Sequence, residues 1–90
     1  MIRLTVTRIC PSRAKLVQYL LDMGWYQKFE SESYHIREGF EDYASGKWYV
    51  EIPIAESKLE FYVSDIIEAL SAYLESDIIS VYNEIVSTIV

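Results

Sequence analysis

The spacing of apolar residues changes along this chain, and that change limits the folds it can adopt. Apolar side chains recur at every second position over residues 2–9 and 47–54, as in strands that bury one face. They recur at every third or fourth position over residues 12–23, 61–75 and 78–88, as in amphipathic helices. Both periods therefore occur within one short chain, which predicts a mixture of strands and helices.

Local signals predict where these elements begin and end. Pro11 suits the first position of the first helix, and Gly24 suits a left-handed cap after it. Residues 25–29 and 34–37 are predicted to form two short strands joined by a turn, and residues 39–46 a loop bounded by two glycines. A polar connection follows at 55–58, and Asp77 is predicted to cap the last helix.

The predicted order is β-α-β-β-β-α-α, an α+β fold with a small antiparallel sheet and helices packed on one face. Residues 1–90 are expected to form a single globular domain. Hydrophobic residues make up 51% of the chain, with only 3 Gly and 2 Pro, which is the composition of a folded protein.

Charge is sorted by position within a net charge of −6. Residues 1–21 contain Arg3, Arg8, Arg13 and Lys15 but no acid, whereas residues 59–90 contain acids but no base. The C-terminal part is therefore expected to repel nucleic acid and anionic lipid. This distribution favours a protein partner over nucleic acid.

The residues that usually support metal or cofactor chemistry are scarce. One histidine and one cysteine cannot form a structural zinc site, and no calcium loop or Gly-rich phosphate loop is present. We therefore expect no cofactor and no metal. A single Cys10, which we interpret as a small buried residue, fits a reducing compartment, and the absence of a long apolar run predicts a cytoplasmic protein without a membrane span.

Aromatic residues are concentrated in the middle of the chain, and Tyr accounts for 8 residues in all. Exposed Tyr side chains are typical of binding surfaces, although the same rings could fill the core. Stacking on single-stranded bases would require more Lys and Arg among the rings than this sequence has. The predicted surface for a basic partner protein consists of Tyr26, Tyr34, Tyr43, Tyr49, Glu41 and Asp42.

The last helix is a second candidate surface, because its apolar arc is broad. The arc can pack on the preceding helix and the sheet, or it can form a two-fold dimer. The predicted dimer residues are Ile78, Tyr82, Ile85 and Ile89. Under the dimer hypothesis, Ile85→Asp would halve the mass in solution.

His35 is the one residue with evident catalytic potential, since a nearby carboxylate would raise its pKa. The alternative is a strand histidine that faces solvent or is paired with an acid. Along the sequence, His35 is preceded by the predicted helix at 14–23 and by Gly24-Trp25, which begins a strand. It is followed by the predicted strand at 48–53 and then a helix.

That arrangement over residues 12–74 resembles the HicA-like toxin family, which has a double-stranded-RNA-binding-like fold. The family's histidine lies at the start of the second strand in a Gly-Ser/Thr-His-His-type motif, where this chain has Ser33-Tyr34-His35-Ile36. The resemblance implies an RNA-binding protein or ribonuclease that uses His35. In such a protein, Arg13, Lys15 and Lys28 would contact the phosphates of the RNA.

The leading prediction is a small acidic, non-enzymatic interaction module: an accessory subunit, inhibitor or antitoxin-like protein. The HicA-like ribonuclease is the alternative, and a homodimeric structural protein is a third hypothesis. Substitution of His35 distinguishes the first two, because it would affect only the ribonuclease.

Overall fold

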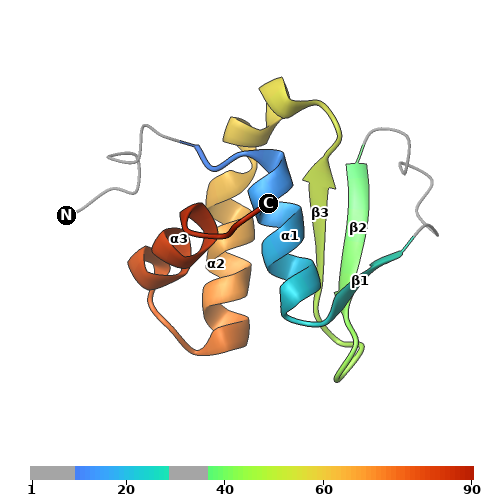
Figure 1. The fold of residues 1–90 in the computed structure, drawn as a ribbon. Helices are drawn as coiled ribbons and strands as arrows, with labels where there is room; N and C mark the ends of the chain where they lie inside the picture. The colour runs from blue at the N-terminus through green and yellow to red at the C-terminus, as the bar shows by residue number, and fades with distance from the viewer. Residues whose placement is uncertain (1–9, 29–36) are drawn as a thin grey trace.

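The computed structural model describes residues 10–28 and 37–90 as an α+β fold, the class predicted from the sequence (Figure 1). The predicted strand at 2–9 lies outside the described residues, as do Tyr34 and His35. The described elements are α1 (Arg13–Asp22), β1 (Trp25–Lys28), β2 (Arg37–Asp42), β3 (Tyr49–Pro53), the 3₁₀ helix η2 (Glu56–Phe61), α2 (Val63–Leu74) and α3 (Ile78–Val86).

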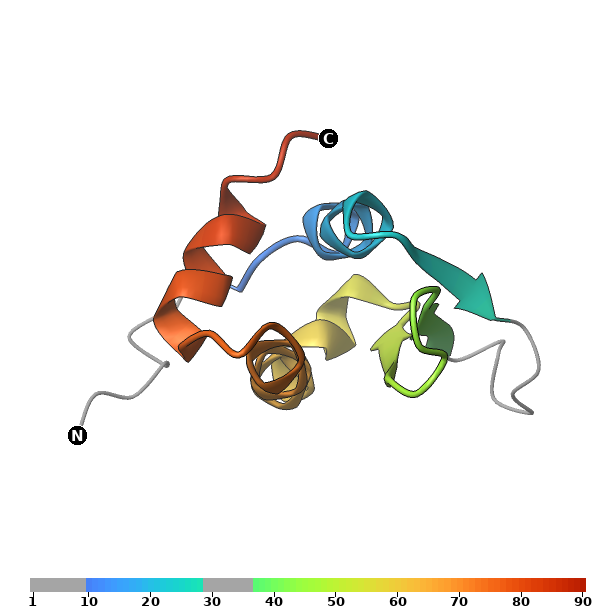
Figure 2. The same ribbon diagram turned by 90° about the horizontal axis from the view of Figure 1, so that it is seen from below.

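The three strands form an antiparallel sheet in the order β1-β2-β3. Helices α1 and α2 lie against one face of this sheet, which confirms the predicted packing, and α3 lies on the far side of the two helices (Figure 2). The molecule therefore has three layers: the sheet, the pair α1 and α2, and α3. No helix of the described chain covers the other face of the sheet (Figures 1 and 2).

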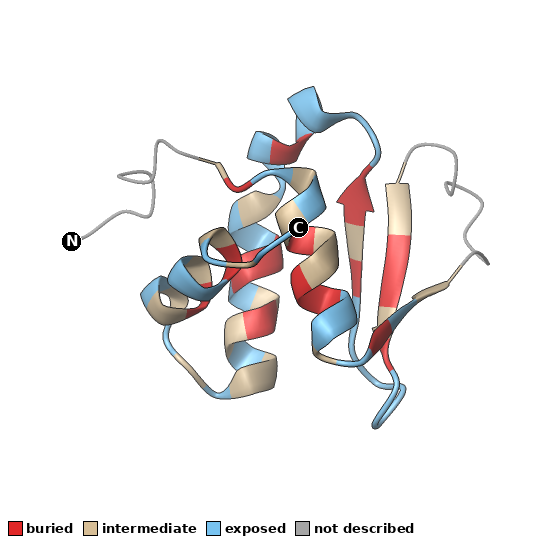
Figure 3. Ribbon diagram, in the orientation of Figure 1, coloured by how far each residue is buried: buried red, intermediate tan, exposed pale blue. Residues whose placement is uncertain are grey.

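The hydrophobic core lies between the sheet and the helices and continues to α3 (Figure 3). Each element contributes the residues of one side, as the 2-residue and 3.6-residue periods require. The most buried of them are Leu16, Leu20, Trp25, Phe40, Ile52, Leu59, Ile67, Leu70, Val81 and Ile85. Every described helix thus depends on this one core.

Strand β2 differs from the predicted arrangement. Residues 39–46 were expected to form a loop, but β2 continues to Asp42, and the turn occupies residues 43–48. Phe40 explains the difference, because its ring is buried beneath the helices at a strand position paired with Val50. Gly39 lies within this strand, and the ring of Tyr49 occupies the space that a side chain at position 39 would need.

The helix ends follow the predicted caps with two changes of position. The Asp77 Oδ1 accepts a hydrogen bond from the Ser80 N–H at 2.8 Å, and Gly24 adopts φ 91° after α1, both as predicted. Helix α1 begins at Arg13 rather than Pro11, because Ser12 supplies its cap. The connection predicted at 55–58 is part of η2 (Glu56–Phe61), so α2 starts at Val63.

Candidate functional site: the open face of the sheet

The uncovered face of the sheet, called the open face below, carries polar and aromatic side chains from all three strands. Its residues are Tyr26, Lys28, Arg37, Gly39, Glu41, Tyr49 and Glu51, which alternate along the strands with the core residues. Tyr26 pairs in register with Glu41, and Glu41 pairs with Tyr49. One row across the sheet therefore places a carboxylate between two exposed tyrosines.

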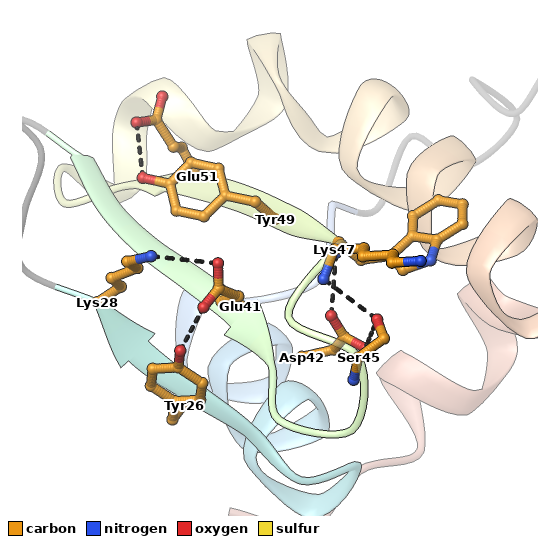
Figure 4. Close-up of polar contacts among 9 residues, drawn as sticks. Tyr26, Lys28, Glu41, Asp42, Ser45, Lys47, Tyr49 and Glu51 are labelled. Atoms are coloured by element: carbon orange, nitrogen blue, oxygen red, sulfur yellow. Dashed lines mark hydrogen bonds and ion pairs between the residues drawn. The ribbon is translucent and has the colours of Figure 1, made fainter.

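Glu41 holds the first of two similar clusters on this face (Figure 4). Its carboxylate accepts a hydrogen bond from the Tyr26 hydroxyl, and its Oε2 lies 3.2 Å from the Lys28 Nζ. The hydrogen bond from Tyr26 and then that from Lys28 lower the pKa of Glu41. The carboxylate is therefore ionised and held in one orientation by two side chains of β1.

Glu51 holds the second cluster. The Tyr49 hydroxyl donates to the Glu51 Oε2 at 3.0 Å, and the Glu51 Oε1 lies 3.5 Å from the Arg37 Nη1 (Figure 4 shows the Tyr49–Glu51 bond). Burial and the hydrogen bond to Glu51 raise the pKa of Tyr49. Each carboxylate of the open face thus binds one tyrosine hydroxyl and one cation of the same chain, so the charges expected to make this surface acidic are balanced locally.

Tyr43 extends the aromatic surface from the strands onto the hairpin turn. Its side chain is 81% exposed, and its ring meets the ring of Tyr26 edge to face with the centroids 6.2 Å apart. The structure therefore brings Tyr26, Tyr43 and Tyr49 to one side of the molecule together with Glu41. Tyr34, the fourth tyrosine of the predicted set, lies outside the described residues.

Asp42 does not belong to this surface, contrary to expectation. Its residue is only 1% exposed, and its carboxylate accepts hydrogen bonds from the Ser45 hydroxyl at 2.6 Å and from the Trp48 N–H at 2.9 Å (Figure 4 shows Asp42 and Ser45). Burial alone would raise the pKa of Asp42, but the hydrogen bonds from Ser45 and Trp48 outweigh it and lower the pKa. Asp42 therefore organises the hairpin turn instead of meeting a partner.

The predicted dimer residues, three on α3 and Ile89 in the tail after it, do not share one exposed surface. Ile85 is 0% exposed, and Ile78 and Tyr82 pack partly buried against the core, whereas Ile89 is 89% exposed. The prediction is wrong for Ile85 because the broad apolar arc is used to cover α1 and α2. Ile79, which the sequence-based set omitted, is an exposed residue of this helix.

The cations expected to contact phosphate are engaged within the chain. Arg13 Nε donates to the Pro53 carbonyl at 2.8 Å, and the Arg13 guanidinium pairs with Glu38. Lys15 Nζ donates to the carbonyl of Val86. With Lys28 bound to Glu41, each of the three would have to leave an internal contact to meet a phosphate.

Sequence reasoning also missed Lys28, Arg37 and Glu51 as members of the open face. The alternation of Glu51 with Val50 and Ile52 was a usable signal, because it places Glu51 opposite the core. No comparable signal existed for Arg37, because the short strand predicted at 34–37 ended there, whereas β2 begins at Arg37 and runs to Asp42.

The described residues contain neither a group of side chains placed to hold a metal ion nor a helix that could cross a membrane. Within residues 10–28 and 37–90, no group of three or more His, Cys, Asp or Glu side chains is placed to hold a metal ion. In the same residues, every helix is too short or too polar to cross a bilayer.

No family model, curated protein or solved structure matches the chain. The resemblance to HicA-like toxins is therefore neither supported nor refuted by comparison. The geometry of the open face, and not similarity to known proteins, is the basis for inferring the function of this chain.

Proposed function

We propose that this chain is a non-enzymatic protein-interaction module that binds a basic partner protein through the open face and Tyr43. In this role it would serve as an accessory subunit, an inhibitor or an antitoxin-like protein of the cytoplasm. The observation that carries the proposal is the one-sided sheet: two helices cover one face, while the other presents exposed tyrosines around a carboxylate.

The tyrosines have the properties of interface residues. A tyrosine ring buries a large area at a small cost in side-chain entropy, and its hydroxyl can meet polar groups at the rim. Tyr26 and Tyr49 are already held by hydrogen bonds to Glu41 and Glu51. A partner would therefore meet side chains whose positions are largely fixed, which lowers the entropic cost of binding.

The net charge of the whole chain, rather than the locally balanced charges of the open face, supports a basic partner over a nucleic acid. The chain has a net charge of −6, which favours encounter with a positively charged protein and opposes approach of a polyanion. The internal contacts of Arg13, Lys15 and Lys28 point the same way, because each would have to be broken for phosphate binding.

Affinity capture from a cell extract, followed by mass spectrometry, tests the proposal. The triple variant Tyr26→Ser/Tyr43→Ser/Tyr49→Ser should lose a basic protein that the unmodified chain retains. Phe61→Ser is the matched control, because Phe61 is 70% exposed on η2, away from the open face. Equal capture by both variants would contradict the proposal.

A second measurement addresses the ribonuclease alternative. Titration with poly(U) RNA should show no binding whose affinity falls steeply with salt. RNA cleavage that is abolished by His35→Ala would establish the alternative and refute the proposal.

A further inference from the structure

We infer that the partner adds an extended strand to the sheet along the outer edge of β3 (Tyr49–Pro53), in antiparallel orientation. This inference rests on the proposed function and specifies how the backbone of the partner is held beside the open face. It commits to one occupant, an extended segment of a protein with Lys or Arg at every second position.

The register of β2 and β3 determines which backbone groups of β3 face outward. Among the described strands, β3 is an end strand in the order β1-β2-β3 (Figure 1). The Asp42 N–H donates to the Trp48 carbonyl at 3.1 Å, so this pair and every second pair after it are hydrogen-bonded between the two strands. The backbone groups of Val50 therefore face β2, whereas those of Tyr49 and Glu51 face away from it.

The outward groups form a short row that a second strand can complete. Within the part of the chain that the structure describes, no hydrogen bond reaches the backbone N–H or carbonyl of Tyr49 or Glu51. Pro53 ends the row, because it has no N–H and its carbonyl accepts the Arg13 Nε. The edge thus offers two N–H donors and two carbonyl acceptors at the spacing of an extended chain, which is how sheet edges bind peptides.

Large apolar side chains at both ends of β3 remain partly uncovered. Trp48, just before the strand, packs edge to face on Tyr73 of α2 with the centroids 5.6 Å apart, yet it is 37% exposed. Ile54, just after the strand, is 43% exposed. An added strand would place every second side chain on the helix side of the sheet, where Trp48 contacts α2. Apolar residues at those positions of the partner would bury surface that this chain leaves exposed.

The charges favour a basic segment over a second copy of this chain. Glu51 is the one charged residue of β3, and its Oε1 lies 3.5 Å from the Arg37 Nη1, farther than the roughly 2.7–2.9 Å of a charge-assisted hydrogen bond. Its carboxylate can therefore accept another N–H, from a Lys or Arg on the added strand, without releasing Arg37 or Tyr49. A second copy would instead bring another net charge of −6 to the same edge.

NMR titration of the ¹⁵N-labelled full chain with the peptide acetyl-(Lys-Val)₄-amide tests the inference. Its Lys residues would lie opposite Tyr49 and Glu51, and its Val residues would face the helices. The amide signals of Tyr49 and Glu51 should shift most, and exchange of these two N–H groups with solvent should slow.

Two N-methylated forms of the peptide are matched controls, because they have the same composition and charge. Methylation of the Lys backbone nitrogens removes the N–H groups that face β3 and should weaken binding about tenfold. Methylation of the Val nitrogens removes N–H groups on the opposite edge of the peptide and should change the affinity by less than about twofold.

A pair of variants tests the edge from the side of the protein. Glu51→Pro removes the outward N–H and should bind the unmethylated peptide more weakly than Glu51→Ala, which keeps this N–H and loses the same charge. The methylated peptides use the unmodified chain, so they decide the matter even if Glu51→Pro does not fold.

Equal affinity of the two methylated peptides would overturn the inference. So would shift changes that spare Tyr49 and Glu51, or a doubled mass of the unliganded chain that Glu51→Pro halves, since a second copy would then occupy the edge. If any of these occurs while the triple tyrosine variant still loses its partner, the proposed function stands and the strand addition does not.

Discussion

The hydroxyl of Tyr49 lies over Gly39 on the neighbouring strand, where an added Cβ would come within 2.1 Å of it. Tyr49 pairs in register with Glu41, so its ring reaches Gly39 along the diagonal between the two strands. The hydrogen bond from Tyr49 to Glu51 therefore depends on the missing side chain at position 39. Gly39 is as much a part of the open face as the tyrosines are.

Gly39→Ala should displace the Tyr49 ring and destabilise the fold by about 1–3 kcal/mol, the usual cost of overpacking. Urea denaturation measures this change. In a Tyr49→Ala background the ring is gone, so the cost of Gly39→Ala should fall below about 1 kcal/mol. The difference between the two backgrounds is the coupling energy of the pair, which for residues in contact is about 0.5–3 kcal/mol. The same cost in both backgrounds would show that the two residues are not coupled.

Asp42→Ala should destabilise the fold more than Ser45→Ala. The Asp42 carboxylate accepts hydrogen bonds from both the Ser45 hydroxyl and the Trp48 N–H, and Ser45→Ala removes only the first of these two. The pKa of Asp42 is lowered in the folded state, so its contribution to stability is present above the unfolded pKa of about 3.9 and is lost as pH falls through the folded value. Denaturation between pH 7 and pH 2 should therefore show a smaller acid-induced loss for Asp42→Asn than for the unmodified chain. Identical pH profiles would contradict this role.

Tyr19→Phe should weaken the attachment of α3 to α1, because the Tyr19 hydroxyl donates to the Glu84 Oε1 at 2.7 Å. The expected cost is about 1 kcal/mol, measured by urea denaturation at pH 7. Burial and then the carboxylate of Glu84 raise the pKa of Tyr19, so its contribution is present below the unfolded pKa of about 10 and is lost as pH rises toward the folded value. Tyr19→Phe should remove this part of the alkaline loss, and an unchanged alkaline profile would argue against it.

Ile85→Ala should destabilise the fold by about 2–5 kcal/mol, since Ile85 is fully buried, whereas Ile89→Ala should cost less than about 0.5 kcal/mol. Thermal denaturation of the two variants gives the comparison.

Ile85→Asp is expected to unfold the chain and so cannot test the dimer hypothesis. Ile89→Asp can, because a halved mass in sedimentation would then report on association alone.

Periodic and capping signals predicted most of the helical structure. The apolar spacing over 61–88 and the cap at Asp77 follow from neighbours in the sequence, and the structure confirms them. The outward position of Tyr49 likewise follows from its alternation with Val50. These features depend on local geometry, which a single sequence records.

Features that depend on distant residues were not predicted. Gly39 looks like a loop residue until Tyr49, ten positions away, is known to cross it. Asp42 looks like a solvated acid beside Glu41 until the hairpin brings the Trp48 N–H to its carboxylate. In both cases the pairing of the strands determines what the residue contacts, and this pairing cannot be read from the local sequence.

The three-layer order described above separates two ends of the molecule. The open face lies on one side of the α1 and α2 pair and α3 on the other (Figures 1 and 2). Free-energy changes at sites separated by a layer of helices usually add, because the sites share no contacts. Glu41→Gln on the sheet and Ile79→Asp on α3 should therefore have additive effects on stability when combined in one chain, and binding at the sheet should leave the stability of α3 unchanged.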